Sequence, residues 1–483
     1  MYRKSVNKNL VDTVSAAPNV LLLYTDQQRY DSLGCNGSAW ADTPNSDRLA
    51  YQGTVFPHYF VQSPLCMPSR ISFLTGRYCG ATGAGSNGVR FPEHETCVAE
   101  LFASYGYATA NIGKLHLIPH ANRDHTALHP AFGFDYRLIS DEPGCYEDPY
   151  LAWVRAKDPA ALPYVTTSLP PESKAYGHPE LSQRGREVHE IAVWETDENL
   201  SHSAFVADRT IDYLSRFRQT DQPFFAIAGF YAPHTPINPP QSCLDRVVRD
   251  AVPGRLRGDN YEHGGLGPQP DYLTDVSEEQ WRDIAWHYHA LVTHVDDQIG
   301  KILQFLRQAG LDRNTIVVLC SDHGEYLGDY GRIQKGMPGQ DSVTRVPLIV
   351  YDPRPGQRTL VDPERSFVEA VDVMPTLLDM CGLPVAATMQ GQSLLRRPNK
   401  TSALTEYFEP QGYAAATIRT EGYRYYRDSS GREYLFDLVN DPGALRNLAG
   451  SQPAKSALSD HRALLLDRLL ASALVGPAKT AAY

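Results

Sequence analysis

The chain has 483 residues and a formal net charge of −11, from 45 Lys and Arg against 56 Asp and Glu. This length exceeds the usual size of one domain and predicts a large domain followed by a smaller one. The acidic balance argues against general binding to nucleic acid or to an anionic membrane, because both need a basic surface. A small cationic pocket for an anionic substrate remains compatible with it.

The N-terminal residues, the lengths of the apolar runs and the cysteines indicate the cellular compartment in which we expect the protein. No apolar run approaches the length of a membrane span, and residues 1–19 lack the continuous apolar region of a signal peptide. Eight cysteines are spread without CxxC pairs, which is typical of reduced thiols. We expect a cytoplasmic protein, or a periplasmic one if an export signal has been removed.

Four short apolar runs each lead into a cluster of polar residues, and such runs are typical of strands that are buried on both faces. They span residues 20–24, 108–112, 224–230 and 315–320. Patterns with helical spacing lie between them, at residues 97–105, 203–216 and 278–306. This alternation predicts a doubly wound, mostly parallel α/β sheet that binds ligands at the carboxyl ends of its strands.

Two stretches and the C-terminal part do not follow this alternation. Residues 118–190 and 238–274 have no clear period, and we expect long loops or insertions there. Beyond residues 370–384 the pattern changes to short strands and a leucine-rich helix, at residues 413–418, 422–426, 433–438 and 459–475. The pattern predicts a main α/β domain over residues 1–395 and a small α+β domain, with an antiparallel sheet and a terminal helix, over 396–483.

Two aspartates follow predicted strands directly. Carboxylates at the ends of adjacent parallel strands, here Asp26 and Asp322, can converge on a hard divalent cation. Gln27 and His323 would add an amide oxygen and an imidazole nitrogen. A lone aspartate at a strand end is more often a helix cap or a turn residue. Two of them, each with a neighbour able to bind metal, favour a metal site.

Several cationic or proton-carrying side chains gather at the same predicted edge. Lys114, His116, His234 and Lys335, with Arg70, would form a pocket suited to a tetrahedral oxyanion. Taken singly, a lysine is usually a surface residue and a histidine is usually structural. Three histidines on the long helical pattern have no carboxylates arranged beside them, and we interpret them as structural: His287, His289 and His294.

The stretch from Cys66 to Arg77, CMPSRISFLTGR, resembles the signature CxPSRxxxLTGR of the type I sulfatases in the alkaline phosphatase superfamily. The resemblance implies that a maturation enzyme reads the proline and the arginine and oxidises Cys66 to formylglycine. The thiol itself would be a poor nucleophile here, since its attack on sulfate would leave a sulfur–sulfur species. The resemblance covers nearly the whole chain and implies an alkaline-phosphatase-like fold.

The resemblance also assigns roles to the residues. It implies that the metal ligands are Asp26, Gln27, Cys66, Asp322 and His323. It implies that the catalytic residues are Cys66, Arg70, Lys114, His116, His234 and Lys335. It implies that the substrate is bound by Asn87, Lys114, His234 and Lys335. Many relatives have two successive aspartates where this chain has Asp26-Gln27, and asparagine in place of His323. The pairs found here resemble choline sulfatases and phosphonate monoester hydrolases, which leaves Ca²⁺ as the first choice of metal and Mn²⁺ as the alternative.

The implied reaction is hydrolysis of a sulfate monoester by a formylglycine gem-diol at position 66. One hydroxyl oxygen attacks sulfur in line while Lys114 and Lys335 hold sulfate oxygens. His234 or a lysine stabilises the leaving alcohol. The second hydroxyl then loses its proton to His116, and elimination of sulfate restores the aldehyde.

Three functions remain open from the sequence. The leading one is a sulfatase acting on a small-molecule or saccharide sulfate ester, which the Lys114–His116 motif GKLH favours. The enzymatic alternative is a phosphonate monoester hydrolase or phosphodiesterase on the same scaffold, and the non-enzymatic one is a binder of anionic ligands. The leucine-rich segment 464–475 is compatible with a homo-oligomer contact or with docking on the main domain.

Overall fold

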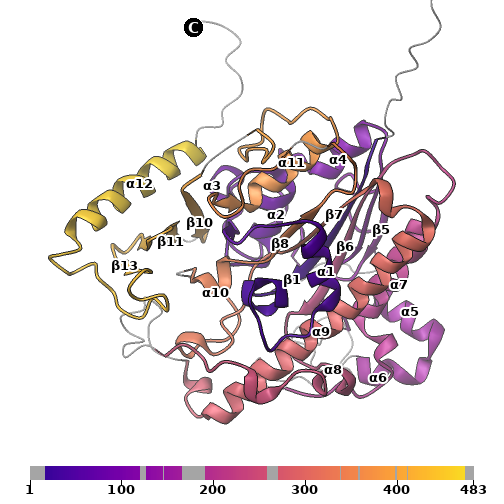
Figure 1. Cartoon of the computed structure of the whole chain (residues 1–483), viewed down its shortest axis with the longest axis horizontal. Helices are drawn as coiled ribbons and strands as arrows, with labels where there is room; N and C mark the ends of the chain where they lie inside the picture. The colour runs from indigo at the N-terminus through magenta and orange to yellow at the C-terminus, as the bar shows by residue number, and fades with distance from the viewer. Residues whose placement is uncertain are drawn as a thin grey trace, which may run out of the picture.

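The computed structural model describes residues 17–119, 127–144, 146–165, 191–257, 270–337, 339–356, 359–396, 400–410 and 412–473. Its centre is a seven-stranded sheet in the order β2-β8-β7-β1-β6-β4-β5 (Figure 1). The strands are β1 Asn19–Asp26, β2 Thr54–Val55, β4 Ala108–Gly113, β5 Tyr136–Ile139, β6 Phe224–Pro233, β7 Thr315–Ser321 and β8 Leu348–Tyr351. The five strands from β7 to β5 are parallel, and β8 and β2 add antiparallel pairs. The predicted mostly parallel α/β sheet is confirmed.

Helices cover both faces of this sheet because successive side chains of its central strands enter two different cores. Leu21 and Leu23 of β1 point into one core, whereas Val20 and Leu22 point into the other. The first core is closed by α1 Pro44–Gln52, α5 Pro149–Lys157, α6 Leu162–Val165, α7 His202–Ser215, α8 Gln241–Leu244 and α9 Glu278–Ala309. The second is closed by α2 Cys66–Thr75, α4 Val98–Ser104 and α11 Val373–Met380. Two further short helices are α3 Cys79–Thr82 and α10 Asp341–Thr344.

The C-terminal part forms a second, antiparallel sheet of four strands in the order β10-β11-β12-β13. These strands and the helix beside them are β10 Ser402–Phe408, β11 Ala414–Thr420, β12 Tyr423–Asp428, β13 Glu433–Asp437 and α12 Lys455–Ala473. Figure 1 shows α12 beyond this sheet, on the side away from α7 and α9. A small core joins Leu404, Ile418 and Leu465 to Tyr78 and Val371 of the larger part. A separate two-stranded pair, β3 Tyr59–Phe60 with β9 Val368–Glu369, contacts β10 of the C-terminal sheet.

The four predicted strands and three predicted helices are present, but the expectation of loops over 118–190 was wrong in part. Strand β5 and helix α5 lie there, and residues 120–126, 145 and 166–190 are outside the described residues. Strand β5 is short and mostly half-buried at the sheet edge, so it lacks a continuous apolar run. Strand β10 was also not predicted. The stretch 238–274 contains only short helical turns where it is described, and 258–269 lie outside.

Two further findings concern the thiols and the helices. All seven cysteines among the described residues are free thiols, and Cys145 lies outside them. None of the described helices is long and apolar enough to cross a membrane.

A buried ionic network connects α12 to the main part of the chain. The fully buried Glu369 carboxylate accepts from Lys400 Nζ at 2.8 Å, Arg468 Nη2 at 2.7 Å and the Tyr78 hydroxyl at 2.7 Å. Lys400 Nζ also lies 2.6 Å from Asp372 Oδ1. Although burial opposes it, the two cations hold the pKa of Glu369 below its ordinary value. A buried charge network of this kind is sensitive to the loss of one member.

We expect Glu369→Gln to lower the free energy of unfolding by about 3 kcal/mol, because it leaves buried cations without their carboxylate. The matched control is Arg155→Ala, which breaks the exposed pair with Glu147 and should cost less than about 1 kcal/mol. Urea unfolding of both variants measures the difference. Equal unfolding midpoints for the two variants would show that the buried network contributes no more to the free energy of unfolding than an exposed ion pair does.

Candidate active site

The site lies at the carboxyl ends of the two central strands β1 and β7. Thr25 pairs with Ser321 in the parallel register, so Asp26 and Asp322 leave the sheet side by side. The backbone N–H of Asp322 donates to Thr25 O at 3.2 Å, and the N–H of Gln27 donates to Asp322 Oδ1 at 3.1 Å. Both aspartate side chains are fully buried. The predicted convergence of the two strand-end carboxylates is therefore present.

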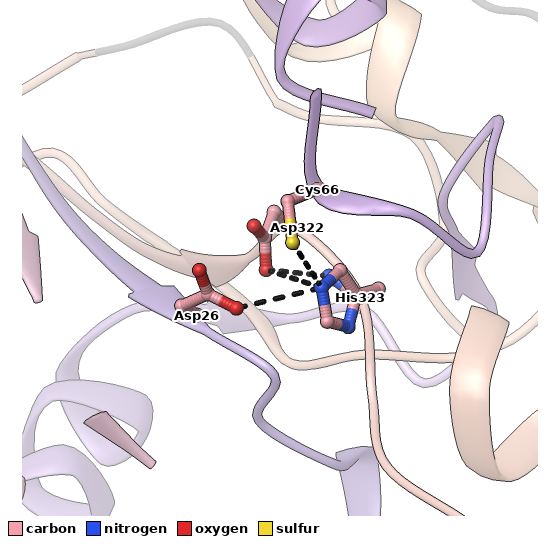
Figure 2. A group of neighbouring side chains, drawn as sticks. All are labelled: Asp26, Cys66, Asp322 and His323. Atoms are coloured by element: carbon pink, nitrogen blue, oxygen red, sulfur yellow. Dashed lines mark hydrogen bonds and ion pairs between the residues drawn. The ribbon is translucent and has the colours of Figure 1, made fainter. Parts of the chain in front are cut away.

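Four side chains form a compact group at this edge (Figure 2). One donor atom each from Asp26, Cys66, Asp322 and His323 lies within 4.8 Å of the others. His323 Nε2 is 3.4 Å from Asp26 Oδ1, 3.7 Å from Asp322 Oδ1 and 3.2 Å from Cys66 Sγ. Asp26 Oδ1 is buried without a hydrogen-bond donor among the described residues. The arrangement concentrates acceptor atoms around one point.

The tautomer of His323 supports the interpretation of this group as a metal site. Its Nδ1 lies 2.8 Å from Gly324 O, so Nδ1–H donates there and Nε2 of the neutral ring carries a lone pair. That lone pair faces two carboxylate oxygens, a repulsive arrangement that a cation would relieve. Although burial opposes it, Asp322 raises the pKa of His323, so a proton and a metal ion compete for Nε2. This donor set fits a divalent cation.

Gln27 connects the carboxylates to the cysteine through Lys335. The Gln27 Oε1 atom accepts from Lys335 Nζ at 3.1 Å, and the same Nζ lies 2.8 Å from Cys66 Sγ. The Gln27 Nε2 group donates to Glu325 Oε2. Glu325 is fully buried and also accepts from the Leu327 N–H at 3.0 Å. Glu325 fixes the orientation of the Gln27 amide, so that its oxygen points to Lys335.

Cys66 is the first residue of α2, and its side chain is 2% exposed. Burial and Asp26 oppose ionisation of the thiol, yet Lys335 and His323 lower its pKa. Asn87, predicted to bind substrate, accepts from the backbone N–H of Met67 through Oδ1 at 3.1 Å. Asn87 therefore lies beside the N-terminus of α2 and is itself exposed.

Arg70 and Lys114 contact the buried carboxylates directly. Arg70 Nε donates to Asp322 Oδ2 at 2.7 Å, its Nη2 lies 3.4 Å from Asp26 Oδ2, and its guanidinium packs on the Tyr24 ring at 4.8 Å. Lys114 Nζ forms an ion pair with Asp26 Oδ2. The resemblance implies that Arg70 is catalytic, and the structure places its guanidinium against the two aspartates. Arg70 positions these carboxylates.

Two histidines lie at the margin of this group. The ring of His234 packs on Tyr231 with 4.7 Å between centroids, and its Nδ1 lies 2.7 Å from Thr235 O. Burial and the nearby Lys335 lower its pKa well below the ordinary value. Tyr231 also carries Lys114 Nζ over its ring at 4.6 Å, so it bridges the histidine and the ion pairs.

His116 is held by its backbone. Its φ is 53°, and its N–H donates to Asp141 Oδ1 at 2.8 Å. The side chain is buried, two residues after Lys114.

Three residues at the site were not predicted: Tyr24, Tyr231 and Glu325. Each one lies within three residues of a predicted site residue at the end of a strand. This proximity is the only indication of their location that the sequence contains. Their roles depend on contacts between elements that are remote in the chain.

The chain is similar to known sulfatases over most of its length. The sulfatase family matches residues 18–383, and the C-terminal family of N-sulphoglucosamine sulphohydrolase matches residues 328–469. An arylsulfatase of Clostridium perfringens (strain 13 / Type A) is 30% identical over 476 residues, which cover 94% of each chain.

Two solved structures share the fold. The phosphonate monoester hydrolase of Agrobacterium radiobacter has a TM-score of 0.76 at 24% identity, over 95% of this chain and 96% of that one. A protein solved in complex with its substrate D-glucosamine-2-N,6-O-disulfate has a TM-score of 0.71 at 20% identity, over 96% of this chain and 100% of that one. The family match spans most of the sequence and includes every residue of the group described above. The chain belongs to the sulfatase family and is a sulfuric ester hydrolase.

Proposed function

We propose that this enzyme hydrolyses a sulfate monoester to an alcohol and inorganic sulfate, with formylglycine made from Cys66 as its nucleophile and one divalent cation. The observation that carries the proposal is the position of Cys66. Its Sγ lies 2.8 Å from Lys335 Nζ and 3.2 Å from His323 Nε2, beside two buried carboxylates. A maturation enzyme that recognises the CMPSR stretch would supply the aldehyde.

Asp26, Gln27, Asp322, His323 and the modified residue 66 would hold the cation. When bound, the cation would lower the charge of the buried carboxylates and polarise oxygen atoms placed against it. The two carboxylates, the amide oxygen and the imidazole are ligands that Ca²⁺ and Mn²⁺ both accept. Ca²⁺ is the first choice because oxygen ligands predominate.

The cationic side chains divide the work at the sulfate group. Lys335 is the lysine that touches Cys66 Sγ, so it would bind a sulfate oxygen at the point of attack. Lys114, which is fully buried and paired with Asp26, would bind a second oxygen. Arg70 keeps Asp26 and Asp322 in fixed orientations.

The two histidines would handle protons. At neutral pH His234 is uncharged in the free enzyme, since its pKa is lowered well below the usual range. In that state its single N–H is on Nδ1 and donates to Thr235 O, so Nε2 would face the leaving oxygen as an acceptor until it takes up a proton, and charge on this oxygen would be balanced by the neighbouring lysines. His116 would accept the proton that is released when sulfate departs.

The substrate would be a small-molecule or saccharide sulfate ester. The arylsulfatase from Clostridium perfringens supports an aryl ester, and the solved complex with D-glucosamine-2-N,6-O-disulfate supports a sulfated sugar. The similarity to a phosphonate monoester hydrolase keeps phosphonate monoesters as a second candidate. The pairs Asp26-Gln27 and Asp322-His323 are the residues that favour this alternative.

We expect the purified enzyme to hydrolyse 4-nitrophenyl sulfate with a kcat/KM at least about tenfold above that for the matched 4-nitrophenyl phenylphosphonate. The reason is the GKLH motif, which places Lys114 against Asp26 and matches sulfatases. Release of 4-nitrophenol measures both reactions. A higher kcat/KM for the phosphonate would make the second candidate the primary activity.

We expect Cys66 to carry formylglycine when the protein is made in cells with a maturation enzyme. Mass spectrometry of the tryptic peptide 49–70 should show a loss of mass equal to the exchange of CH₂SH for CHO. The same peptide from cells without that enzyme serves as the control. An intact thiol in cells that mature a known sulfatase would refute the formylglycine.

We expect Asp26→Asn to lower the affinity for the divalent cation by at least about tenfold, because a buried anionic ligand is replaced by a neutral one. Metal content after dialysis against limiting Ca²⁺ or Mn²⁺ measures the effect. Asp212→Asn, on the exposed side of α7, is the matched control. Equal metal content in both variants would exclude Asp26 as a ligand.

A further inference from the structure

A cavity of about 60 Å³ lies behind Tyr231 and His234, between the loop after β6, the start of α7 and the middle of α9. Its deep end is formed by buried side chains, including Tyr150, Leu291 and His294. Trp194 lies at its half-buried margin. None of these residues was assigned a role in the reaction.

Two shared residues join this cavity to the proposed sulfate pocket. The Tyr231 ring contacts Lys114 Nζ at 4.6 Å on one side and the His234 ring at 4.7 Å on another, and both Tyr231 and His234 line the cavity. Since His234 is the group proposed to face the leaving oxygen, the part of the substrate attached to that oxygen extends past it. The cavity is therefore placed where the alcohol of the ester would lie.

The lining carries no formal charge at neutral pH. Among the described residues that line the cavity there is no Asp, Glu, Lys or Arg. Burial lowers the pKa of His202 and of His294 to about 3, and lowers that of His234 as well, so the three histidines are neutral. Most of the other lining side chains are aromatic or apolar, such as Tyr150, Trp194 and Leu291. A charged group placed here would lose its hydration without gaining a partner.

His202 gives this apolar cavity a polar contact. It is 7% exposed, and its ring interacts with the backbone of Ser140 through a hydrogen bond. A neutral imidazole offers one donor and one acceptor. Ligand cavities commonly combine apolar walls with a few such polar groups.

Resting on the proposed function, we propose that this cavity is the leaving-group subsite and that it selects an uncharged alcohol of one aromatic ring, a phenol in the simplest case. Tyr150, Trp194 and Tyr231 supply aromatic surfaces for the ring. The volume of about 60 Å³ is below the roughly 150 Å³ that encloses benzene, so one ring fits only with its edge at the mouth. Ring systems with carboxylate or further sulfate groups are disfavoured.

The experiment compares phenyl sulfate with 3-carboxyphenyl sulfate. The two esters have the same ring, and only the second carries an additional carboxylate on it. For the wild-type enzyme we expect kcat/KM to be at least about tenfold higher for phenyl sulfate, because the carboxylate would be buried without a cation. The variant Asn238→Lys brings a cation to the half-buried margin of the cavity and should shrink this ratio several-fold. Asn440→Lys makes the same change at an exposed position of the C-terminal part and should leave the ratio unchanged.

A binding measurement keeps the subsite testable apart from turnover. In saturation-transfer NMR with the unmodified full chain, we expect a signal for phenol and a much weaker one for 3-hydroxybenzoate, with the phenol signal reduced in Trp194→Ala. If neither ester is hydrolysed but phenol binds in this way, the sulfatase proposal fails and the subsite stands. Equal kcat/KM values for the two esters, or equal NMR signals for the two phenols, would overturn the subsite.

Discussion

The burial of two carboxylates side by side is the constraint on which this site depends. The parallel register of β1 and β7 brings Asp26 and Asp322 to one point, and both are removed from water. Two unpaired anions there would be strongly unfavourable, so the fold has to supply positive charge. Arg70 reaches both carboxylates from α2, and Lys114 reaches Asp26 from the end of β4.

The need to neutralise these carboxylates explains why the cationic side chains at the site have different partners. Arg70 and Lys114 are engaged by the aspartates, whereas Lys335 contacts the Gln27 amide and Cys66 Sγ. A neutral amide at position 27 leaves Lys335 without a carboxylate partner in that contact. Its charge is therefore available to an anionic substrate, and a glutamate in the same place would have bound it. The Gln27 side chain thus affects the charge presented beside Cys66.

The sequence was sufficient to predict the strands whose residues are apolar on both faces, and with them the convergence of Asp26 and Asp322. The CMPSR stretch was sufficient to single out Cys66. The orientation of the side chains at the site could not be predicted in the same way, because it is set by contacts between segments that are distant in the sequence. The hydrogen bond from Gln27 to Glu325 and the ion pair of Arg70 with Asp322 each join residues more than 200 positions apart. Strand β5 escaped prediction because its half-buried edge position imposes no continuous apolar pattern.

The same geometry separates recognition of the acid from recognition of the alcohol. In the proposed function the acid group would be met by Lys335, Lys114 and the cation site, where interaction energy depends on charge and on tetrahedral shape, both of which sulfates and phosphonates share. The alcohol would be met in the cavity lined by Tyr231 and His234, whose lining is uncharged and largely aromatic or apolar, so that the energy would depend on apolar area and on the absence of charge. Selectivity between sulfate and phosphonate and selectivity among alcohols can therefore vary independently. An enzyme built in this way can tolerate related acid groups while remaining selective for the alcohol.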